Sequence, residues 1–291
     1  MVLPVMHHGR RIARHARQLR SQTMPRVRSG AHSGRGTVFF LAPEHGEPAG
    51  GIKVIYRHAE VLNRAGIPAR VLHRTRGYQI PLLDSDAPIS HVGSTFLGRQ
   101  DLLVVPEIWG ADLRRLEPGI SHVVFNQSGH LTWNRDPSAV NDHITSSPDL
   151  RAIVTVSDHS RELLTYAFPR LRIDRVHVSV DPQVFAPGAG ARQRQISFMP
   201  RRGAKEATQV LSLLRARGAL GGWNVVPIEN RAESDVAEIM RSSLIFLSFA
   251  YQEGFGLPAV EAMASGCYVT GFDGFGGREF LRPEFSSPVP T

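Results

Sequence analysis

The sequence has a single cysteine, Cys267, among its 291 residues. One cysteine excludes an intrachain disulfide and any metal site built from several cysteines, and this fits a reducing compartment. The small neighbours in "ASGCYVTG" predict a buried side chain at this position. Long apolar runs are also missing, because no stretch reaches the roughly 18 to 20 residues of a membrane-spanning helix. We therefore expect a cytoplasmic protein, or one bound peripherally at the inner face of a membrane.

Acidic residues are missing from the start of the chain, where Glu44 is the first. The first 35 residues hold eight arginines, which leaves 26 basic residues against 26 acidic residues in the rest. The net charge of +8 therefore comes from this tail, and the body of the protein is neutral. The tail also lacks the roughly 7 to 15 consecutive apolar residues of a secretory signal peptide.

Three interpretations of residues 1–35 stay open. So little apolar sequence predicts a basic, disordered tail, which a misassigned start codon would also explain. Ile12, Ala16 and Leu19 fall on one helical face, so a basic amphipathic helix in contact with anionic lipid is an alternative. An organelle transit peptide has a similar composition.

From residue 36 the chain alternates short apolar runs, polar or glycine-containing loops and segments of helical periodicity. Strands are predicted at 37–42, 69–73, 101–106, 122–127 and 152–157, with helices from Ile52 to a stop at Gly66 and over 158–168. Continuous apolar strands that alternate with helices indicate a parallel sheet covered on both faces.

The same alternation restarts after the Pro- and Gly-containing segment "DPQVFAPGAGARQRQ". Strands are predicted at 196–200, 224–228 and 244–248, with a helix that ends near Gly218. We predict an α/β protein with two doubly wound, Rossmann-like domains, 36–185 and 186–291, that face a cleft. Three predicted strands are too few for a doubly wound domain, and we expect the second domain to be short and incomplete.

One strand, loop and helix stand out in "LIFLSFAYQEGFGLPAVEAMASG", residues 244–266. Pro258 suits the first position of a helix, and Gly266 suits its end. Gly254 and Gly256 leave backbone N–H groups accessible at the helix N-terminus, where unpaired donors and the macrodipole favour an anion such as phosphate.

Two glutamates bracket this loop. Glu261, one turn inside the helix, is placed to accept hydrogen bonds from a diol such as ribose. Glu253, on the loop side, points toward whatever extends beyond the phosphate. The alternative is an ordinary helix start with two solvated carboxylates.

The segment "EGFGLPAVEAMASG" resembles the E-x7-E element of retaining glycosyltransferases with the GT-B fold, in particular glycosyltransferase family 4. "TVSDHSRELL" and "VSVDPQVFAP" resemble two further segments of that family, although Val178 and Ser179 replace its Asn-Gly. The resemblance implies transfer of a sugar from a nucleotide-sugar donor to an acceptor, with retention of anomeric configuration and without a metal or other cofactor. It implies that Glu253 orients the sugar and that the nucleotide is held by Gly254, Phe255, Gly256, Leu257 and Glu261.

Basic residues in "MPRRGAKEA" provide charge for a diphosphate. Arg201 and Lys205 resemble the family's Arg and Lys at this loop, where they stabilise the departing diphosphate. Arg202 is an alternative to Arg201. Only two lysines occur in the chain, Lys53 and Lys205, and both lie in or beside glycine-containing loops. The alternative is a solvated charged loop.

Loops of the first domain contribute further candidates. Gly50 and Gly51 resemble the family's N-terminal glycine loop near the donor phosphate or the acceptor, and a structural turn is the alternative. "VFNQSGHLTW" places His130, after Asn126 and Gln127, where it could face the cleft and act in catalysis. "VPEIWG" places Glu107 and Trp109 after a strand, where the indole could stack on a sugar or pack in the core.

The loop "GFGGRE" resembles the family's later Gly-Gly…Glu loop but is one residue tighter, so no role is transferred to Glu279. The expected partners are a nucleotide sugar and a glycan, lipid-linked or small-molecule acceptor, with contact to a membrane surface through residues 1–35 as an option and no nucleic acid. Two other classes remain alternatives. One is a truncated, inactive glycosyltransferase-like fragment, and the other is a module that binds nucleic acid or a lipid surface through its basic tail.

Overall fold

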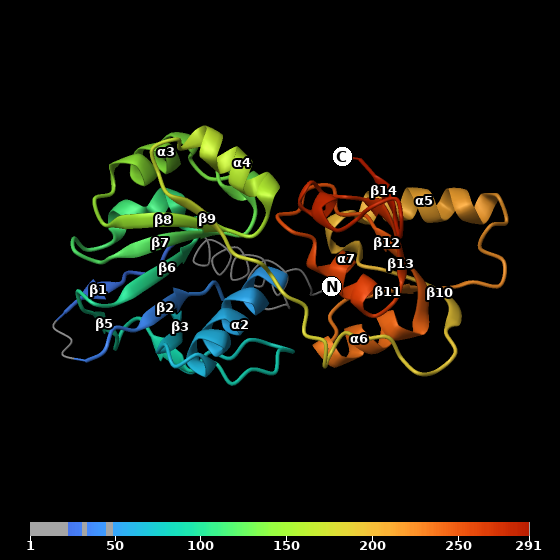
Figure 1. Cartoon of the computed structure of the whole chain (residues 1–291), viewed down its shortest axis with the longest axis horizontal. Helices are drawn as coiled ribbons and strands as arrows, with labels where there is room; N and C mark the ends of the chain where they lie inside the picture. The colour runs from blue at the N-terminus through green and yellow to red at the C-terminus, as the bar shows by residue number, and fades with distance from the viewer. Residues whose placement is uncertain (1–22, 31–33, 45–48, 291) are drawn as a thin grey trace, which may run out of the picture. The chain divides into compact units, whose positions relative to one another are not determined.

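The computed structural model describes residues 23–30, 34–44 and 49–290, and contacts divide the chain into two compact units (Figure 1). Unit 1 consists of the described parts of Met1–Pro81, Ser85–Phe125 and Leu131–Ile153. Unit 2 consists of Leu82–Asp84, Asn126–His130 and Val154–Thr291. The elements are described below sheet by sheet, and β9, α4 and the end of β8 belong to unit 2.

The first sheet has seven strands in the order β4-β3-β2-β6-β7-β8-β9. Its pairs β3–β4, β2–β3, β2–β6 and β6–β7 are parallel. The strands are β2 (Val38–Leu41), β3 (Ala69–His73), β4 (Ile89–His91), β6 (Leu102–Pro106), β7 (His122–Asn126), β8 (Leu150–Thr155) and β9 (Ile173–Arg175). The helices that accompany them are α2 (Gly50–Arg64), η1 (Glu107–Arg115), η2 (Gly129–Leu131), α3 (Pro137–Ser146) and α4 (Asp158–Ala167).

The second sheet has five parallel strands in the order β11-β10-β12-β13-β14. The strands are β10 (Gln193–Phe198), β11 (Asn224–Pro227), β12 (Ser243–Ser248), β13 (Tyr268–Phe272) and β14 (Ser287–Val289). The helices are η3 (Pro200–Arg202), α5 (Ala204–Ala216), α6 (Glu233–Ser242), α7 (Leu257–Ala264) and η4 (Gly276–Glu279). All of these elements belong to unit 2.

The strand order reverses once in each sheet. In the first sheet the chain builds β2, β3 and β4 outward and then returns to β6, and in the second it builds β10 and β11 and then returns to β12. Ligands of open α/β sheets bind outside the carboxyl ends of the strands at such a reversal. The loops after β2 and β6, and those after β10 and β12, are therefore the places to look for a site.

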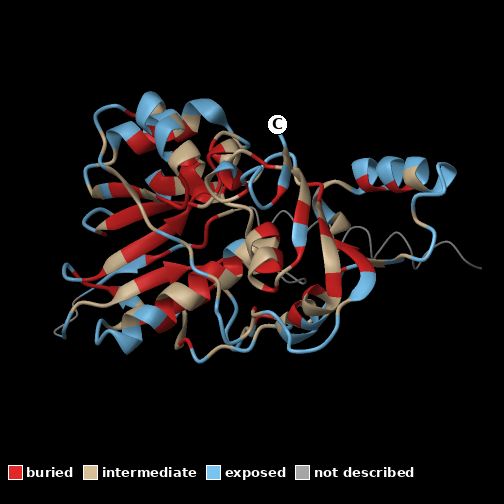
Figure 2. Ribbon diagram, turned by 45° about the vertical axis from the view of Figure 1, so that its right-hand side comes forward, coloured by how far each residue is buried: buried red, intermediate tan, exposed pale blue. Residues whose placement is uncertain are grey.

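Buried residues run along the strands, and the outer faces of the helices are exposed (Figure 2). In unit 2 the core between β12, β13, α6 and α7 includes Phe246, Val269, Met240 and Ala262. Cys267 joins this core at 6% exposure, which confirms the prediction of a buried cysteine. Burial raises the pKa of its thiol to about 11, so the side chain behaves as a small apolar residue.

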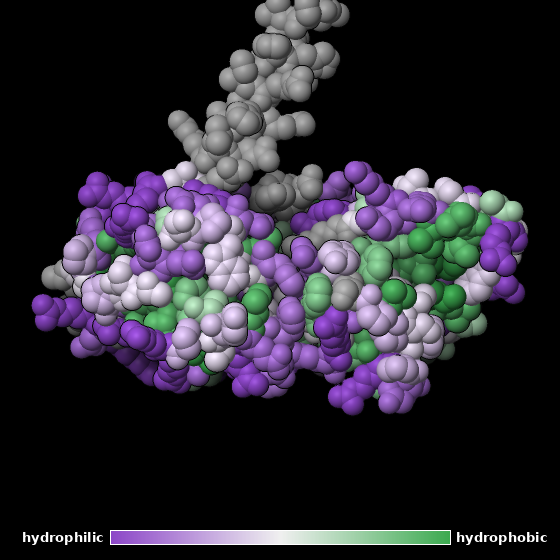
Figure 3. All heavy atoms as spheres, turned by 90° about the horizontal axis from the view of Figure 1, so that it is seen from above, coloured by the Kyte–Doolittle hydropathy of each residue, from purple (hydrophilic) through white to green (hydrophobic). Residues whose placement is uncertain are grey.

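Helix α5 is the least buried helix of unit 2 among the described residues. Its buried residues are Ala207 and Leu211, whereas Val210 and Leu213 are exposed. Hydrophobic side chains gather at the right-hand end of the surface in Figure 3, where Figure 1 places α5.

The sequence predicted the α/β class with parallel sheets, and the structure confirms it. The expected shortage of strands in the second domain is wrong. Strands β13 and β14 were missed because "YVTGF" and "SPV" carry glycine, polar residues and proline in place of a continuous apolar run. Helix α6 was missed because its apolar residues are few.

The tail also differs from the prediction in part. Met24 and Val27 are buried, the backbone N–H of Met24 donates to Asp112 at 2.9 Å, and β1 (Arg28–Ser29) pairs with β5 (Phe96–Leu97). Residues 23–30 are therefore packed on unit 1 and are not disordered, because the side chains of Met24 and Val27 are buried in it. The amphipathic helix considered around Ile12 to Leu19 lies outside the described residues.

Candidate functional site

Helix α7 begins at the reversal of the second sheet with a glycine instead of a side-chain cap. Gly256 is its N-cap residue, with φ at +93°, a left-handed conformation that glycine adopts without steric cost. Pro258 lies in the first turn, as the sequence predicted. A helix N-terminus without a side-chain acceptor presents its first backbone N–H groups and the positive end of the macrodipole to an anion.

The loop before α7 packs directly on the backbone that follows β7, within unit 2. A Cβ atom added to Gly254 would lie 1.7 Å from the carbonyl oxygen of Gln127 and 2.8 Å from Cα of Ser128. Only glycine permits this approach. The structure thus brings the predicted 126–130 loop against the predicted donor loop.

The two glutamates of the motif differ in their surroundings. Glu261 is buried on α7 at 6% exposure. Glu253 is half-buried, its backbone N–H donates to the carbonyl of Gly274 at 2.9 Å, and it forms an isolated parallel bridge with Phe275. Phe255 lies between them in sequence, with its ring 5.2 Å from that of Phe280. Solvated carboxylates, the alternative reading, do not describe Glu261.

The basic residues after β10 lie at the same reversal. Arg201 lies in η3 and Lys205 in the first turn of α5. Lys205 was expected in a loop, but it is helical. Both side chains are exposed. Gly203, between them, lies against the end of β12, since an added Cβ would be 2.4 Å from the carbonyl oxygen of Phe249. Arg202 also lies in η3.

His130 belongs to a stack of rings. Its centroid lies 5.2 Å from that of His159 and 4.9 Å from that of Phe275, and the rings of His159 and Phe275 are 4.8 Å apart at 18°. Desolvation, and secondarily the charge of His159, lower the pKa of His130. Desolvation, and secondarily the charge of Arg278, lower the pKa of His159. Both rings are therefore favoured in the neutral form.

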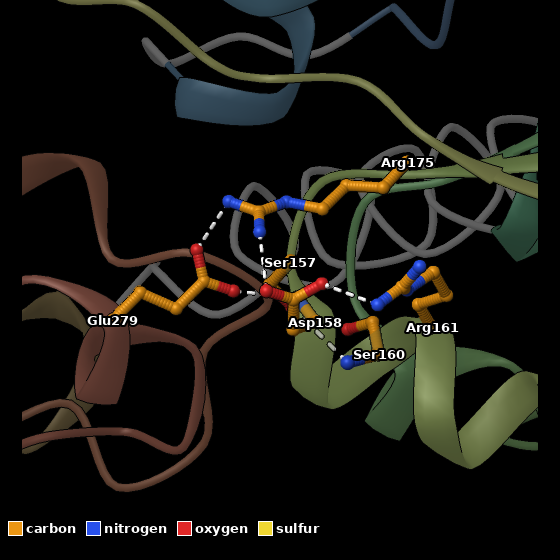
Figure 4. Close-up of polar contacts among 6 residues, drawn as sticks. All are labelled: Ser157, Asp158, Ser160, Arg161, Arg175 and Glu279. Carbon is orange, nitrogen blue, oxygen red and sulfur yellow. Dashed lines mark hydrogen bonds and ion pairs between the residues drawn. The ribbon is translucent and has the colours of Figure 1, made fainter.

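A network that sequence reasoning missed joins α4, β9 and η4 (Figure 4). The Arg175 guanidinium binds the carboxylates of Asp158, at 2.5 Å, and Glu279. The other oxygen of Glu279 accepts the backbone N–H of Asp158 at 2.5 Å, and Arg161 pairs with Asp158 at 3.0 Å. Ser157 caps the same helix end. The position of Asp158 shortly after β8 was the available signal, but no spacing rule links it to Arg175 or Glu279.

Unit 1 has a different polar cluster at the carboxyl ends of β2 and β3. Tyr56 Oη lies 2.8 Å from Nε2 of the fully buried His73, whose Nδ1 lies 3.9 Å from Glu44. The same carboxylate of Glu44 accepts from the backbone and hydroxyl of Thr75. Burial lowers the pKa of His73 to about 4, which the charge of Glu44 opposes. Sequence reasoning missed this cluster.

Two predictions for unit 1 are decided by the structure. Gly50 and Gly51 form the first turn of α2, with Ala49 as N-cap, and do not form a loop before it. Trp109 is 2% exposed and Glu107 6% exposed in η1. Trp109 is thus a core residue that offers no face to a sugar.

Across the described residues, no group of three or more His, Cys, Asp or Glu side chains is arranged to hold a metal ion. Within the same ranges, every helix is too short or too polar to cross a membrane.

A family model matches a part of the chain that contains α7, and one relative matches most of the chain. Residues 211–287, which include α7 and both motif glutamates, match the family model described as Glycosyl transferases group 1. An "Alpha-1,6-glucosyltransferase" of Actinobacillus pleuropneumoniae serotype 7 (strain AP76) is 29% identical over 238 residues, which cover 78% of this chain and 69% of that protein.

Solved structures resemble the fold over most of the chain. Sucrose-phosphate synthase from Thermosynechococcus elongatus matches with a TM-score of 0.63 and 15% identity, over 88% of this chain and 86% of that one. Anabaena HepE in complex with UDP-glucose matches with a TM-score of 0.60 and 13% identity, over 88% and 85%. The family match and the relative support a glycosyltransferase, and the solved structures support the GT-B fold.

Proposed function

We propose that the chain transfers a sugar from a nucleotide-sugar donor to a hydroxyl-bearing acceptor with retention of anomeric configuration. The observation that carries the proposal is the helix start at Gly256, uncapped by a side chain, with the buried Glu261 one turn inside it, at the reversal of the second sheet. This arrangement suits a diphosphate next to a ribose. The relative named as an alpha-1,6-glucosyltransferase, and HepE crystallised with UDP-glucose, make UDP-glucose the first donor to test.

Each residue of the site has a proposed task. The N-terminus of α7, with Arg201 and Lys205, stabilises the negative charge that grows on the diphosphate as the bond to the sugar breaks. Glu261 accepts hydrogen bonds from the ribose, and Glu253 orients the sugar. These tasks are positioning and electrostatic stabilisation, so we propose that no metal ion is required.

The proposed reaction occurs on one face of the sugar. The bond between the anomeric carbon and the diphosphate oxygen breaks, and the acceptor oxygen bonds to the same face of that carbon. The proton of the acceptor hydroxyl passes to the departing phosphate oxygen, so the products are a glycoside and a protonated nucleoside diphosphate. His130, which is favoured in the neutral form, is proposed to contact the sugar.

Product analysis tests this proposal. The full chain is incubated with UDP-glucose, and separately with GDP-, ADP- and dTDP-glucose, in the presence of glucose, maltose and a glucosyl-lipid as acceptors. The anomeric proton coupling of any product, read by NMR, is expected to show the same configuration as the donor. An inverted product would contradict retention. If no donor and acceptor pair gives transfer, and no donor is hydrolysed, the result would favour the alternative of an inactive glycosyltransferase-like protein.

A further inference from the structure

Glu279 is anchored through both of its carboxylate oxygens. One oxygen accepts the N–H of Asp158, the first residue of α4, at 2.5 Å, and the other is bound by the guanidinium of Arg175 (Figure 4). A carboxylate at a helix N-terminus is stabilised by the macrodipole. The side chains of Glu279 and Arg175 are only 19% and 16% exposed, so water screens this pair less than an ordinary surface pair. The anchor therefore fixes one end of the turn that follows β13.

The turn between Asp273 and Glu279 is held in an uncommon conformation. Phe275 has φ at +66°, a positive value that a non-glycine residue rarely adopts unless its surroundings impose it. Asp273 accepts the N–H of Phe275 at 2.9 Å and the Nε–H of Arg278 at 3.0 Å. The guanidinium of Arg278 lies 4.7 Å above the Phe275 ring, a cation–π arrangement.

This turn touches two residues that the proposed function uses. The carbonyl of Gly274 accepts the N–H of Glu253 at 2.9 Å, and Phe275 forms the bridge with Glu253. The ring of Phe275 also packs on His130, at 4.9 Å, and on His159. A shift of the turn would therefore move the backbone of Glu253 and release the ring of His130 together.

We propose that Glu279 is a positioning residue that, held by Arg175 and by the N-terminus of α4, fixes the turn Asp273–Phe275 and through it the two residues that face the donor sugar. This inference rests on the proposed function for the roles of Glu253 and His130. The nucleotide half of the donor is assigned to α7 and Glu261, whereas the sugar half is assigned to Glu253 and His130, the two residues that the turn contacts. Loss of the anchor should thus weaken recognition of the sugar more than recognition of the nucleotide.

Three variants of the full chain test the inference. Glu279→Gln keeps an oxygen for the N–H of Asp158 but removes the charge that pairs with Arg175. Arg175→Lys removes the fork that reaches two carboxylates. Asp174→Asn is the matched control, because Asp174 also lies on β9 but its carboxylate pairs at 2.7 Å with the exposed Arg172, which precedes the strand.

Two measurements separate positioning from general stability. Hydrogen exchange of the unliganded proteins reports the amide of Glu253, which should exchange at least tenfold faster in Glu279→Gln and Arg175→Lys and as in the wild type in Asp174→Asn. Calorimetric titration with UDP and with UDP-glucose gives the ratio of the two affinities. In both anchor variants the affinity for UDP-glucose relative to that for UDP should fall about tenfold. The affinity for UDP itself should change by less than threefold.

The outcomes distinguish this inference from the proposed function. Unchanged exchange at Glu253 in both anchor variants would overturn the inference whatever the protein binds. Faster exchange with an equal loss of affinity for UDP and for UDP-glucose would also overturn it, because the anchor would then support the whole donor site and not the sugar contacts in particular. A wild-type protein that binds neither ligand would count against the proposed UDP-glucose donor, while the exchange result would still decide whether Glu279 holds the loop.

Discussion

The polar cluster after β2 and β3 of unit 1 and the loop before α7 of unit 2 use different chemistry. In unit 1, Tyr56, His73 and Glu44 lie close together, and Trp109 is buried after β6. Helix α3 of that unit begins with a side-chain cap, Asp136, which accepts the N–H of Ala139 at 3.1 Å. In unit 2, α7 begins with glycine and no side-chain cap.

This difference shows where a charged ligand fits best. Polar side chains that bond to one another, as Tyr56 bonds to His73, are engaged before any ligand arrives. Glycines let two backbones approach closely and leave helix N–H groups for an anion. We therefore propose that unit 2 binds the nucleotide, and the variants below test the contrast from the largest expected effect to the smallest.

Gly254→Ala should have the largest effect. The added Cβ would overlap the carbonyl oxygen of Gln127, so either loop must move. We expect the free energy of unfolding to fall by at least about 3 kcal/mol, and donor binding to be lost. Gly190→Ala is the control, because its Cβ would meet no atom within 4 Å. Chemical denaturation of both variants gives the comparison, and similar losses in the two would contradict the close approach.

Lys205→Ala should change activity and leave stability almost untouched. The side chain is exposed, so the free energy of unfolding should stay within about 0.5 kcal/mol. If the ammonium stabilises the leaving diphosphate, kcat should fall about 100-fold. Arg217→Ala, which removes an exposed cation at the other end of α5, should keep kcat. Steady-state kinetics would contradict the assignment if both variants behaved alike.

The polar cluster of unit 1 should make stability depend on pH. Burial lowers the pKa of His73 to about 4 from its ordinary 6.5, so below pH 6.5 the unfolded chain takes up a proton that the folded chain refuses. The contribution is complete above about pH 6.5 and is lost as the pH falls, by about 2 kcal/mol between pH 7 and pH 5. Urea denaturation at pH 7 and pH 5 should show a smaller loss of unfolding free energy in His73→Gln than in the wild type. His177 is exposed, so His177→Gln should show the full loss. An equal loss in the two variants would show that His73 is not its cause.

The smallest effect is expected at the cap of α3. Asp136→Ala removes the acceptor for the N–H of Ala139 and should cost about 1 kcal/mol of stability. Because this helix end is closed by its own side chain, nucleotide affinity should not change. Thermal denaturation with and without UDP measures both quantities, and a loss of the UDP shift would contradict the contrast between α3 and α7.

The sequence was most informative where a local pattern determines local structure. The apolar run "ARVLH" is β3 as predicted, and the Pro258 and Gly266 signals enclose α7. The spacing of Glu253 and Glu261 around a glycine loop was visible for the same reason, since a strand, loop and helix follow one another directly.

Contacts between distant segments could not be predicted. Nothing in "GFGGRE" indicates that Glu279 meets Arg175, which lies 104 residues earlier, or that Phe275 stacks on His159. Composition also could not show that Met24 and Val27, in an arginine-rich tail, are buried in the core of unit 1. Such pairings depend on how the elements pack, and the sequence alone left these residues without assigned roles.

The assignment of the nucleotide to unit 2 is tested most directly by two buried helical glutamates. Glu261 lies on α7, and Glu60 lies on α2 of unit 1, where it pairs with Arg57. Thermal melts of the wild type, Glu261→Gln and Glu60→Gln would be recorded with UDP, GDP, ADP and dTDP. One nucleotide at 100 times its Kd should stabilise the wild type by about 2.7 kcal/mol. The account predicts that Glu60→Gln melts lower but keeps this shift and that Glu261→Gln loses it, whereas an equal shift in all three proteins would contradict it.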